Sequence, residues 1–90
     1  MNVIFQFNEM KLVKIIMSNG NEYEVIWDAN NVKGNFYRMV DVKKGWVYIN
    51  KNYISERYTI GRVVDNKEKI HPKIREVLNE YYGEELFHDD

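Results

Sequence analysis

Short apolar runs rich in β-branched and aromatic residues alternate with turn residues over most of the chain. The runs predict strands at 11–17, 22–28, 36–42, 46–49 and 53–64. Because turn signals recur about every ten residues, the pattern favours a barrel or a strongly curled sheet. We therefore expect a mainly β (α+β) fold: a curled antiparallel sheet or small five-stranded barrel with one C-terminal helix.

The segment SNGN at 18–21 predicts the first hairpin, because Asn-Gly favours a tight turn. A two-residue turn at Asn19-Gly20 would align Ile16 with Tyr23 and bury Lys14. A three-residue loop over 19–21 with a bulge would make one clean apolar face. A one-residue slip flips every side chain, so we expect the bulged loop. It would form the pairs Met17–Tyr23, Ile15–Val25 and Val13–Trp27.

The remaining connections also follow from turn residues. The Asn- and Gly-rich stretch at 28–35 is expected to be a loop, and turns are expected at 43–45 and 50–52. Gly61 suits a bend or bulge in the last strand. We expect the sheet's core to consist of Val13, Ile15, Met17, Tyr23, Val25, Trp27, Ile49, Ile54 and Ile60.

The segment PKIREVLNEYYG at 72–83 has the 3.6-residue hydrophobic period of a helix, in place of the two-residue period of the preceding strands. Its apolar residues follow the i, i+3, i+4, i+7 spacing. Pro72 fits the first helical turn and Gly83 the position after the last. We expect a helix packed across the sheet, contributing Ile74, Val77, Leu78 and Tyr81 to the core.

Ninety residues with an apolar fraction of 44 % suffice for one domain with a real core. We expect a single domain over 1–90, with 1–9 as an extra N-terminal strand or arm and 84–90 as an acidic tail. The chain has no cysteine, which excludes disulfides and thiolate metal sites. Neither a signal peptide nor a membrane-spanning run is recognisable, so we expect a cytoplasmic protein that does not contact membranes.

The net charge of −1 conceals a strongly uneven distribution. Residues 1–32 carry a net charge of −2, residues 33–75 of +7 and residues 76–90 of −6. Three interpretations remain open. The acidic helix and tail could neutralise the basic sheet, the basic strands could contact phosphates, or the acidic helix could approach a basic protein surface.

The segment GWVYINKNYISERYTIGRVV at 45–64 combines aromatic residues with lysine and arginine. If Val47 and Ile49 face the interior, Trp46 and Tyr48 are exposed beside basic side chains. Such an array suits base stacking or a protein interface. Alternatively, the core and the C-terminal helix cover both faces. The candidate partner- or nucleic-acid-binding residues are Arg38, Lys43, Lys44, Trp46, Tyr48, Lys51, Arg57 and Arg62.

The stretches VKIIMSNGNEYEV at 13–25 and VYINKNYI at 47–54 resemble the two motifs of Sm-like small barrels, and SH3-like barrels fit equally well. In this alignment Ile49 and Ile54 match the apolar ends of the second motif. Asn50 and Lys51 stand where the Sm-like family has an RNA-contacting Arg-Gly pair. The chain is also similar to small uncharacterised proteins of Gram-positive phages and mobile elements, a resemblance that implies a regulator or inhibitor.

Catalytic patterns are not recognisable in the sequence. His71 and His88 are the only histidines, and neither Ser18 nor Ser55 lies in a nucleophile motif. We expect a non-enzymatic binding module without cofactor or metal that acts through a protein partner, with homodimers or higher oligomers also compatible. The alternatives are a single-stranded nucleic-acid-binding protein and a structural subunit of an oligomeric assembly.

Overall fold

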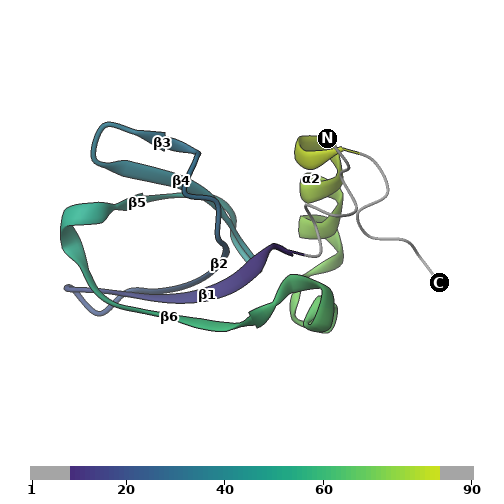
Figure 1. Cartoon of the computed structure of the whole chain (residues 1–90), viewed down its shortest axis with the longest axis horizontal. Helices are drawn as coiled ribbons and strands as arrows, with labels where there is room; N and C mark the ends of the chain where they lie inside the picture. The colour runs from purple at the N-terminus through teal and green to yellow at the C-terminus, as the bar shows by residue number, and fades with distance from the viewer. Residues whose placement is uncertain (1–8, 84–90) are drawn as a thin grey trace.

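The fold is described from a computed structural model, whose described residues are 9–83 (Figure 1). The predicted N-terminal arm, except for Glu9, and the predicted acidic tail lie outside this part of the chain. The strands are β1 (Lys11–Met17), β2 (Glu22–Ile26), β3 (Val32–Lys33), β4 (Phe36–Asp41), β5 (Gly45–Asn50) and β6 (Ile54–Arg62). Three 3-10 turns, η1 (Lys51–Tyr53), η2 (Val63–Asp65) and η3 (Lys67–Lys69), precede the helix α2 (Pro72–Tyr82).

The six strands form one antiparallel sheet that curls without closing. The main path runs β5-β4-β2-β1-β6, with the two-residue β3 as a further partner of β4. Figure 1 shows β4 and β5 on one side of the curl, β1 and β6 on the other, and α2 at one end. The expectation of a curled, mainly β fold with one C-terminal helix is confirmed.

The β1–β2 hairpin has the predicted faces but not the predicted register. Val13 lies opposite Val25 and Ile15 opposite Tyr23, a shift of two residues from the expected pairs. The loop contains three residues, as expected, but they are 18–20, since Met17 N donates to Asn21 O at 2.8 Å. Gly20 closes this loop with φ +93°, a conformation that a bulged three-residue hairpin requires. A shift of two leaves every side chain on its expected face.

The segment expected to be a loop at 28–35 contains a short hairpin. Val32 pairs with Tyr37 and Lys33 with Phe36, so only Gly34 and Asn35 form the turn. Gly34 has φ +59°, which a two-residue hairpin turn needs. Strand β6 is bulged twice along β1, at Ser55 and at Ile60, because neither residue has a partner in the register. The second bulge adjoins Gly61, as predicted, and such bulges increase the curl of a sheet.

Two hydrophobic clusters fill the two faces of the sheet, whereas the sequence predicted one. The inner cluster, enclosed by the curl, contains Val13, Ile15, Val25, Met39 and Ile49, all of which except Met39 were expected in the core. The outer cluster lies under α2 and consists of Leu12, Ile26, Val40, Val42, Val63, Ile70, Ile74 and Leu78. The prediction missed its strand residues. Tyr81, expected in the core, is 46 % exposed, which corrects that expectation.

Helix α2 has the predicted bounds and is anchored at both ends. His71 Nδ1 accepts a hydrogen bond from Lys73 N at 3.1 Å, which caps the first turn before Pro72. At the other end, Tyr82 Oη donates to Asp28 Oδ2 at 2.9 Å, and Asn31 Nδ2 donates to Tyr81 Oη at 3.1 Å. These two bonds hold the loop after β2 against the last turn of the helix.

The environment of Tyr82 favours its neutral form. Burial raises the pKa of the Tyr82 hydroxyl well above its usual range, and the hydrogen bond to Asp28 and its negative charge raise it further. The phenol therefore remains a donor to Asp28 well into the alkaline range.

None of the helices within residues 9–83 is long and apolar enough to cross a membrane.

Candidate functional site

The two aromatic residues of β5 that share one face have different environments. Ile49 is fully buried and Val47 half-buried on the inner face, so Trp46 and Tyr48 both lie on the outer face. Trp46 packs against the outer cluster beneath α2 and is half-buried, so for this residue the alternative of a face covered by the helix applies. Tyr48 lies beyond the helix and is 64 % exposed. The helix thus covers one end of this face and leaves the other open.

Arg38 connects the covered and open ends of the outer face. It lies opposite Tyr48 in the β4–β5 register, and its guanidinium carbon stands 4.1 Å from the centre of the Trp46 ring. The Nε atom is buried without a hydrogen-bond partner. The guanidinium is therefore held by stacking on Trp46 and not by an acceptor from the described residues.

Further aromatic side chains extend this surface in both directions. Tyr81 of α2 contacts Trp46 edge to face, with ring centres 4.8 Å apart. Phe36, two residues before Arg38 on the same face of β4, is 43 % exposed. A hollow of about 260 Å³ lies beside Arg38 and Trp46 and is bounded on the helix side by Val77, Glu80 and Tyr81. We call the set Phe36, Arg38, Trp46, Tyr48 and Tyr81 the outer β4–β5 surface.

The structure brings together three of the candidate residues, Arg38, Trp46 and Tyr48, and separates the other five from them. Lys43 and Lys44 lie in the turn between β4 and β5, and the Lys44 ammonium stands 4.6 Å from the Tyr23 ring centre. Arg62 forms an ion pair with Asp65 at 2.9 Å. The sequence analysis missed Phe36, although its two-residue spacing from Arg38 was a usable signal. It assigned Tyr81 to the core.

Lys51 and Arg57 belong to a second arrangement of cations and rings. Arg57 stacks on Trp27 at 4.5 Å, Trp27 contacts Tyr37 edge to face at 5.1 Å, and Lys51 lies 5.4 Å from Tyr37. Both rings also pack against the inner cluster. A neighbouring hollow of about 350 Å³ is lined by Lys11, Val13, Trp27, Arg57, Tyr58 and Thr59. We call Arg57, Trp27, Tyr37 and Lys51 the cation–aromatic ladder.

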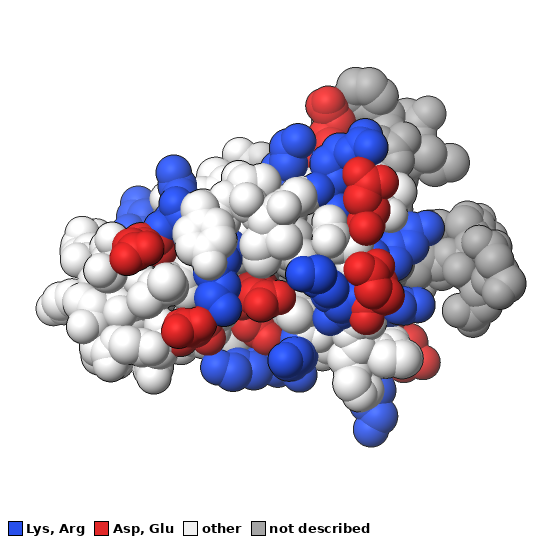
Figure 2. Space-filling view, turned by 90° about the horizontal axis from the view of Figure 1, so that it is seen from below, with Lys and Arg blue, Asp and Glu red and all other residues white. Residues whose placement is uncertain are grey.

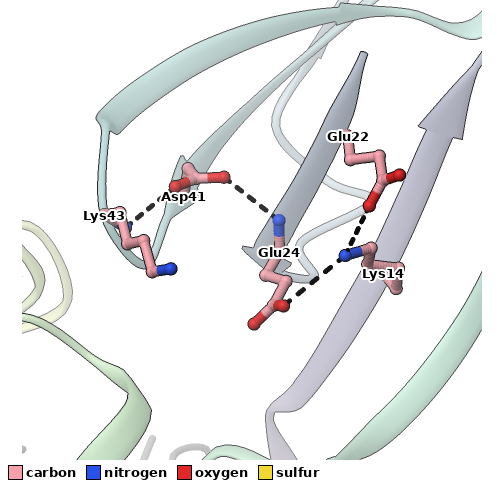
Figure 3. A network of polar contacts seen from close by, with 5 residues as sticks. All are labelled: Lys14, Glu22, Glu24, Asp41 and Lys43. Atoms are coloured by element: carbon pink, nitrogen blue, oxygen red, sulfur yellow. Dashed lines mark hydrogen bonds and ion pairs between the residues drawn. The ribbon is translucent and has the colours of Figure 1, made fainter. Parts of the chain in front are cut away.

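Asp41 is the one charged residue among the described residues that is buried, with 3 % of its surface exposed. Its carboxylate accepts hydrogen bonds from the backbone N–H groups of Lys43 at 2.8 Å, Lys44 at 2.9 Å and Glu24 at 3.1 Å. Figure 3 shows the side chain between the β4–β5 turn and β2. Asp41 therefore fixes the turn and attaches it to the neighbouring strand, a role that the sequence analysis did not find.

A polar hollow of about 220 Å³ lies beside Asp41, lined also by Lys14, Glu22 and Glu24. Lys14 Nζ lies 2.8 Å from Glu22 and 3.6 Å from Glu24, as Figure 3 shows. The hydrogen bond to Glu22 raises the pKa of the Lys14 ammonium, although partial desolvation opposes it. Since these charges are matched within the chain, the hollow offers little to a charged ligand.

The basic middle of the chain does not form one uniform basic face. Figure 2 shows the molecule from the side of β1 and β6, where lysine and arginine alternate with aspartate and glutamate. Charges here are neutralised by neighbours in the sequence or on the next strand. Arg62 of β6 pairs with Asp65 of η2, and Lys14 of β1 pairs with Glu22 of β2.

Within residues 9–83 no group of three or more acidic or histidine side chains could hold a metal ion. The outer β4–β5 surface consists of aromatic rings and a guanidinium for which residues 9–83 provide no acceptor, an arrangement suited to binding. Comparisons of the chain with protein-family models, with curated proteins and with solved structures find no match.

Proposed function

We propose that this chain is a non-enzymatic binding module that recognises a protein partner through the outer β4–β5 surface. The observation that carries the proposal is the Arg38 guanidinium, stacked on Trp46 without an acceptor and flanked by the exposed ring of Tyr48. Arginine, tyrosine and tryptophan are the residues that most often dominate protein interfaces. The described residues provide no acceptor for this half-buried guanidinium. A carboxylate or carbonyl of a partner would accept from its terminal nitrogens, because the buried Nε is out of reach.

The resemblance to small phage and mobile-element proteins would make such a module a regulator or inhibitor. The order β6-β1-β2-β4-β5 also fits the resemblance to SH3-like barrels, as does the 3-10 turn η1 that connects β5 to β6. Since one fold serves many functions, the proposal rests on the surface and not on the fold.

Affinity capture with matched tyrosine variants tests this proposal. Tyr48→Thr removes an exposed ring from the surface, whereas Tyr53→Thr removes a similarly exposed ring, 60 % accessible, from η1. We expect a protein from a lysate of the source cells to be retained by the wild type and Tyr53→Thr but lost by Tyr48→Thr. Identical retention by all three proteins would contradict the proposal.

A single-stranded nucleic acid is the second candidate partner, favoured by the cation–aromatic ladder and the hollow beside it. Exposed Tyr58 and the cations Lys11 and Arg57 line that hollow. Fluorescence anisotropy of labelled RNA and DNA at two salt concentrations tests this candidate, with Tyr58→Thr as the variant. Phosphate binding should weaken steeply as salt rises, and the variant should lose a stacking contact. Absence of binding at low salt removes this candidate.

A further inference from the structure

We propose that the free edge of β5 binds an extended, acidic segment of a protein partner by antiparallel strand addition. This inference rests on the proposed function and specifies how the outer β4–β5 surface engages its partner. The sheet is open, so β5, β6 and the two-residue β3 each have one edge that no described strand pairs with. Only the edges of β5 and β6 are long enough to pair with a further strand. Open edges are templates for another chain unless the sequence protects them.

The two free edges differ in their protection. Strand β6 has two bulges and carries Glu56, Arg57 and Arg62, all of which hinder the pairing of a further strand. Strand β5 pairs with β4 without any shift from Asp41–Gly45 to Phe36–Asn50. Its six residues, GWVYIN, contain neither a charge nor a proline. The edge of β5 is therefore regular and unprotected.

The hydrogen-bond pattern identifies the groups that this edge presents. Lys51 N donates to Asn35 O at 2.8 Å on the β5 side of the hairpin, whereas Arg38 N donates to Asn31 O at 2.9 Å on the other side. Because the pattern alternates along an antiparallel pair, Val47 and Ile49 bond to β4. The main-chain groups of Trp46 and Tyr48 then point to the free edge.

Charge selects the occupant of this edge. Basic residues stand at both ends of β5, Lys43 and Lys44 in the turn before it and Lys51 after it, and Arg38 lies opposite Tyr48. The single acid of residues 32–53, Asp41, is occupied by backbone N–H groups. On the helix side, Glu80 lines the hollow beside Arg38. A second copy paired through β5 would bring these cations against their own equivalents, which costs free energy. A nucleic acid offers phosphate acceptors, but its N–H donors lie on the bases and do not repeat at the spacing of the carbonyls along a strand edge. An acidic peptide strand supplies backbone N–H donors for the carbonyls of β5 and carboxylates for the basic side chains around it.

The geometry also gives the pattern of the segment. In an added antiparallel strand, residues opposite Trp46 and Tyr48 bond to β5 and direct their side chains to the outer face. There they lie next to Trp46 and Tyr48, on the far side of β5 from the Arg38 backbone but facing the guanidinium that extends over the Trp46 ring. Their neighbours point to the inner face, where Val47 and Ile49 contact apolar residues. Acidic residues should therefore alternate with apolar ones.

Fluorescence polarisation with a labelled heptapeptide that alternates glutamate with valine tests this inference. The matched peptide has lysine in place of glutamate and should bind at least about tenfold more weakly. N-methylation of the glutamate amides should weaken binding by about tenfold or more, since it removes the bonding N–H groups. N-methylation of the valine amides should have little effect. Equal or reversed effects of the two methylation patterns would overturn strand addition, as would equal binding of the lysine peptide.

Protein variants separate this inference from the proposed function. Arg38→Gln should reduce binding of the glutamate peptide about threefold or more, whereas Lys73→Gln on α2 should not. If the peptide fails to bind while Tyr48→Thr still loses the captured protein, strand addition is wrong and the surface remains supported. If the lysine and N-methyl peptides bind as expected but Tyr48→Thr retains the captured protein, the captured protein does not bind through the outer β4–β5 surface. A dimer in sedimentation analysis that Tyr48→Pro dissociates would overturn the inference in favour of a second copy.

Discussion

Asp41 and Arg38 lie three residues apart on β4, leave the strand on opposite faces, and differ in how their charges are compensated. Asp41 is buried and accepts three backbone hydrogen bonds. Arg38 is stacked on a ring, and its buried Nε has no partner. The polar groups around Asp41 are thus compensated within the fold, whereas the outer β4–β5 surface retains a donor. This difference indicates a role in stability for the first region and is the basis for the binding role that we propose for the second.

The largest expected effect is that of removing the Asp41 carboxylate. Asp41→Ala should lower the free energy of unfolding by about 3 kcal/mol, because three backbone N–H groups lose a charged acceptor in a buried site. Urea denaturation with linear extrapolation measures this change. Asp41→Asn retains one acceptor oxygen and should lose less. A loss below about 1 kcal/mol for alanine would contradict the assignment of Asp41 as the fixed point of this turn.

The Tyr82–Asp28 bond should have the next largest effect, and it should depend on pH. The folded-state pKa of Tyr82 is raised above its unfolded value, so folding favours the protonated phenol. Its contribution is complete below the unfolded pKa, near 10, and is lost as the pH rises above that value. Tyr82→Phe should lower the free energy of unfolding by about 1 kcal/mol at pH 8.

Urea denaturation of both proteins between neutral pH and about pH 11 measures this dependence, a range that spans the ordinary tyrosine pKa. The difference between the wild type and Tyr82→Phe should shrink toward the alkaline end. A difference that stays constant over the whole range would show that the phenol does not titrate differently in the folded state.

A smaller effect is expected for Lys14, whose partners are both partly exposed. Lys14→Met leaves Glu22 and Glu24 on the same face of β2 without their shared cation. The unfolding midpoint should fall slightly at low salt and recover at high salt, because screening weakens the repulsion between exposed carboxylates. Thermal unfolding at two salt concentrations measures this change in the midpoint, with Lys73→Met as control. A large, salt-independent loss would indicate that Lys14 contributes through packing.

The sequence predicted the helix, every strand except the two-residue β3, and most of the inner cluster. The outer cluster shows why the prediction did not extend further. In KLVKIIM and FYRMVDV, apolar residues occupy both alternating sets of positions. A two-residue period identifies a buried face only where the other face is polar. Leu12 and Val40 therefore carried no signal of their own until α2 was placed over them.

The candidate site was predictable in part for a related reason. Alternation along β5 correctly paired Trp46 with Tyr48 on one face, and the β4–β5 turn brought Arg38 to the same place. The sequence could not show where the helix ends over that face, since this depends on tertiary packing. The role of Asp41 left a weak local sign: an aspartate before a turn can accept hydrogen bonds from the next backbone N–H groups.

The smallest expected effect on stability is that of Arg38, and it is the sharpest test of the comparison with Asp41. Arg38→Met keeps an unbranched side chain over Trp46 and removes a donor that lacks an acceptor. Losing the cation–π contact with Trp46 costs free energy, whereas removing the buried Nε without a hydrogen-bond partner gains free energy. The two should nearly cancel, so the free energy of unfolding should change by less than about 0.5 kcal/mol. The same variant should lose the captured protein partner that the wild type retains. A strongly destabilised Arg38→Met protein would mean that the guanidinium serves the fold, as Asp41 does, and the distinction between the two regions would disappear.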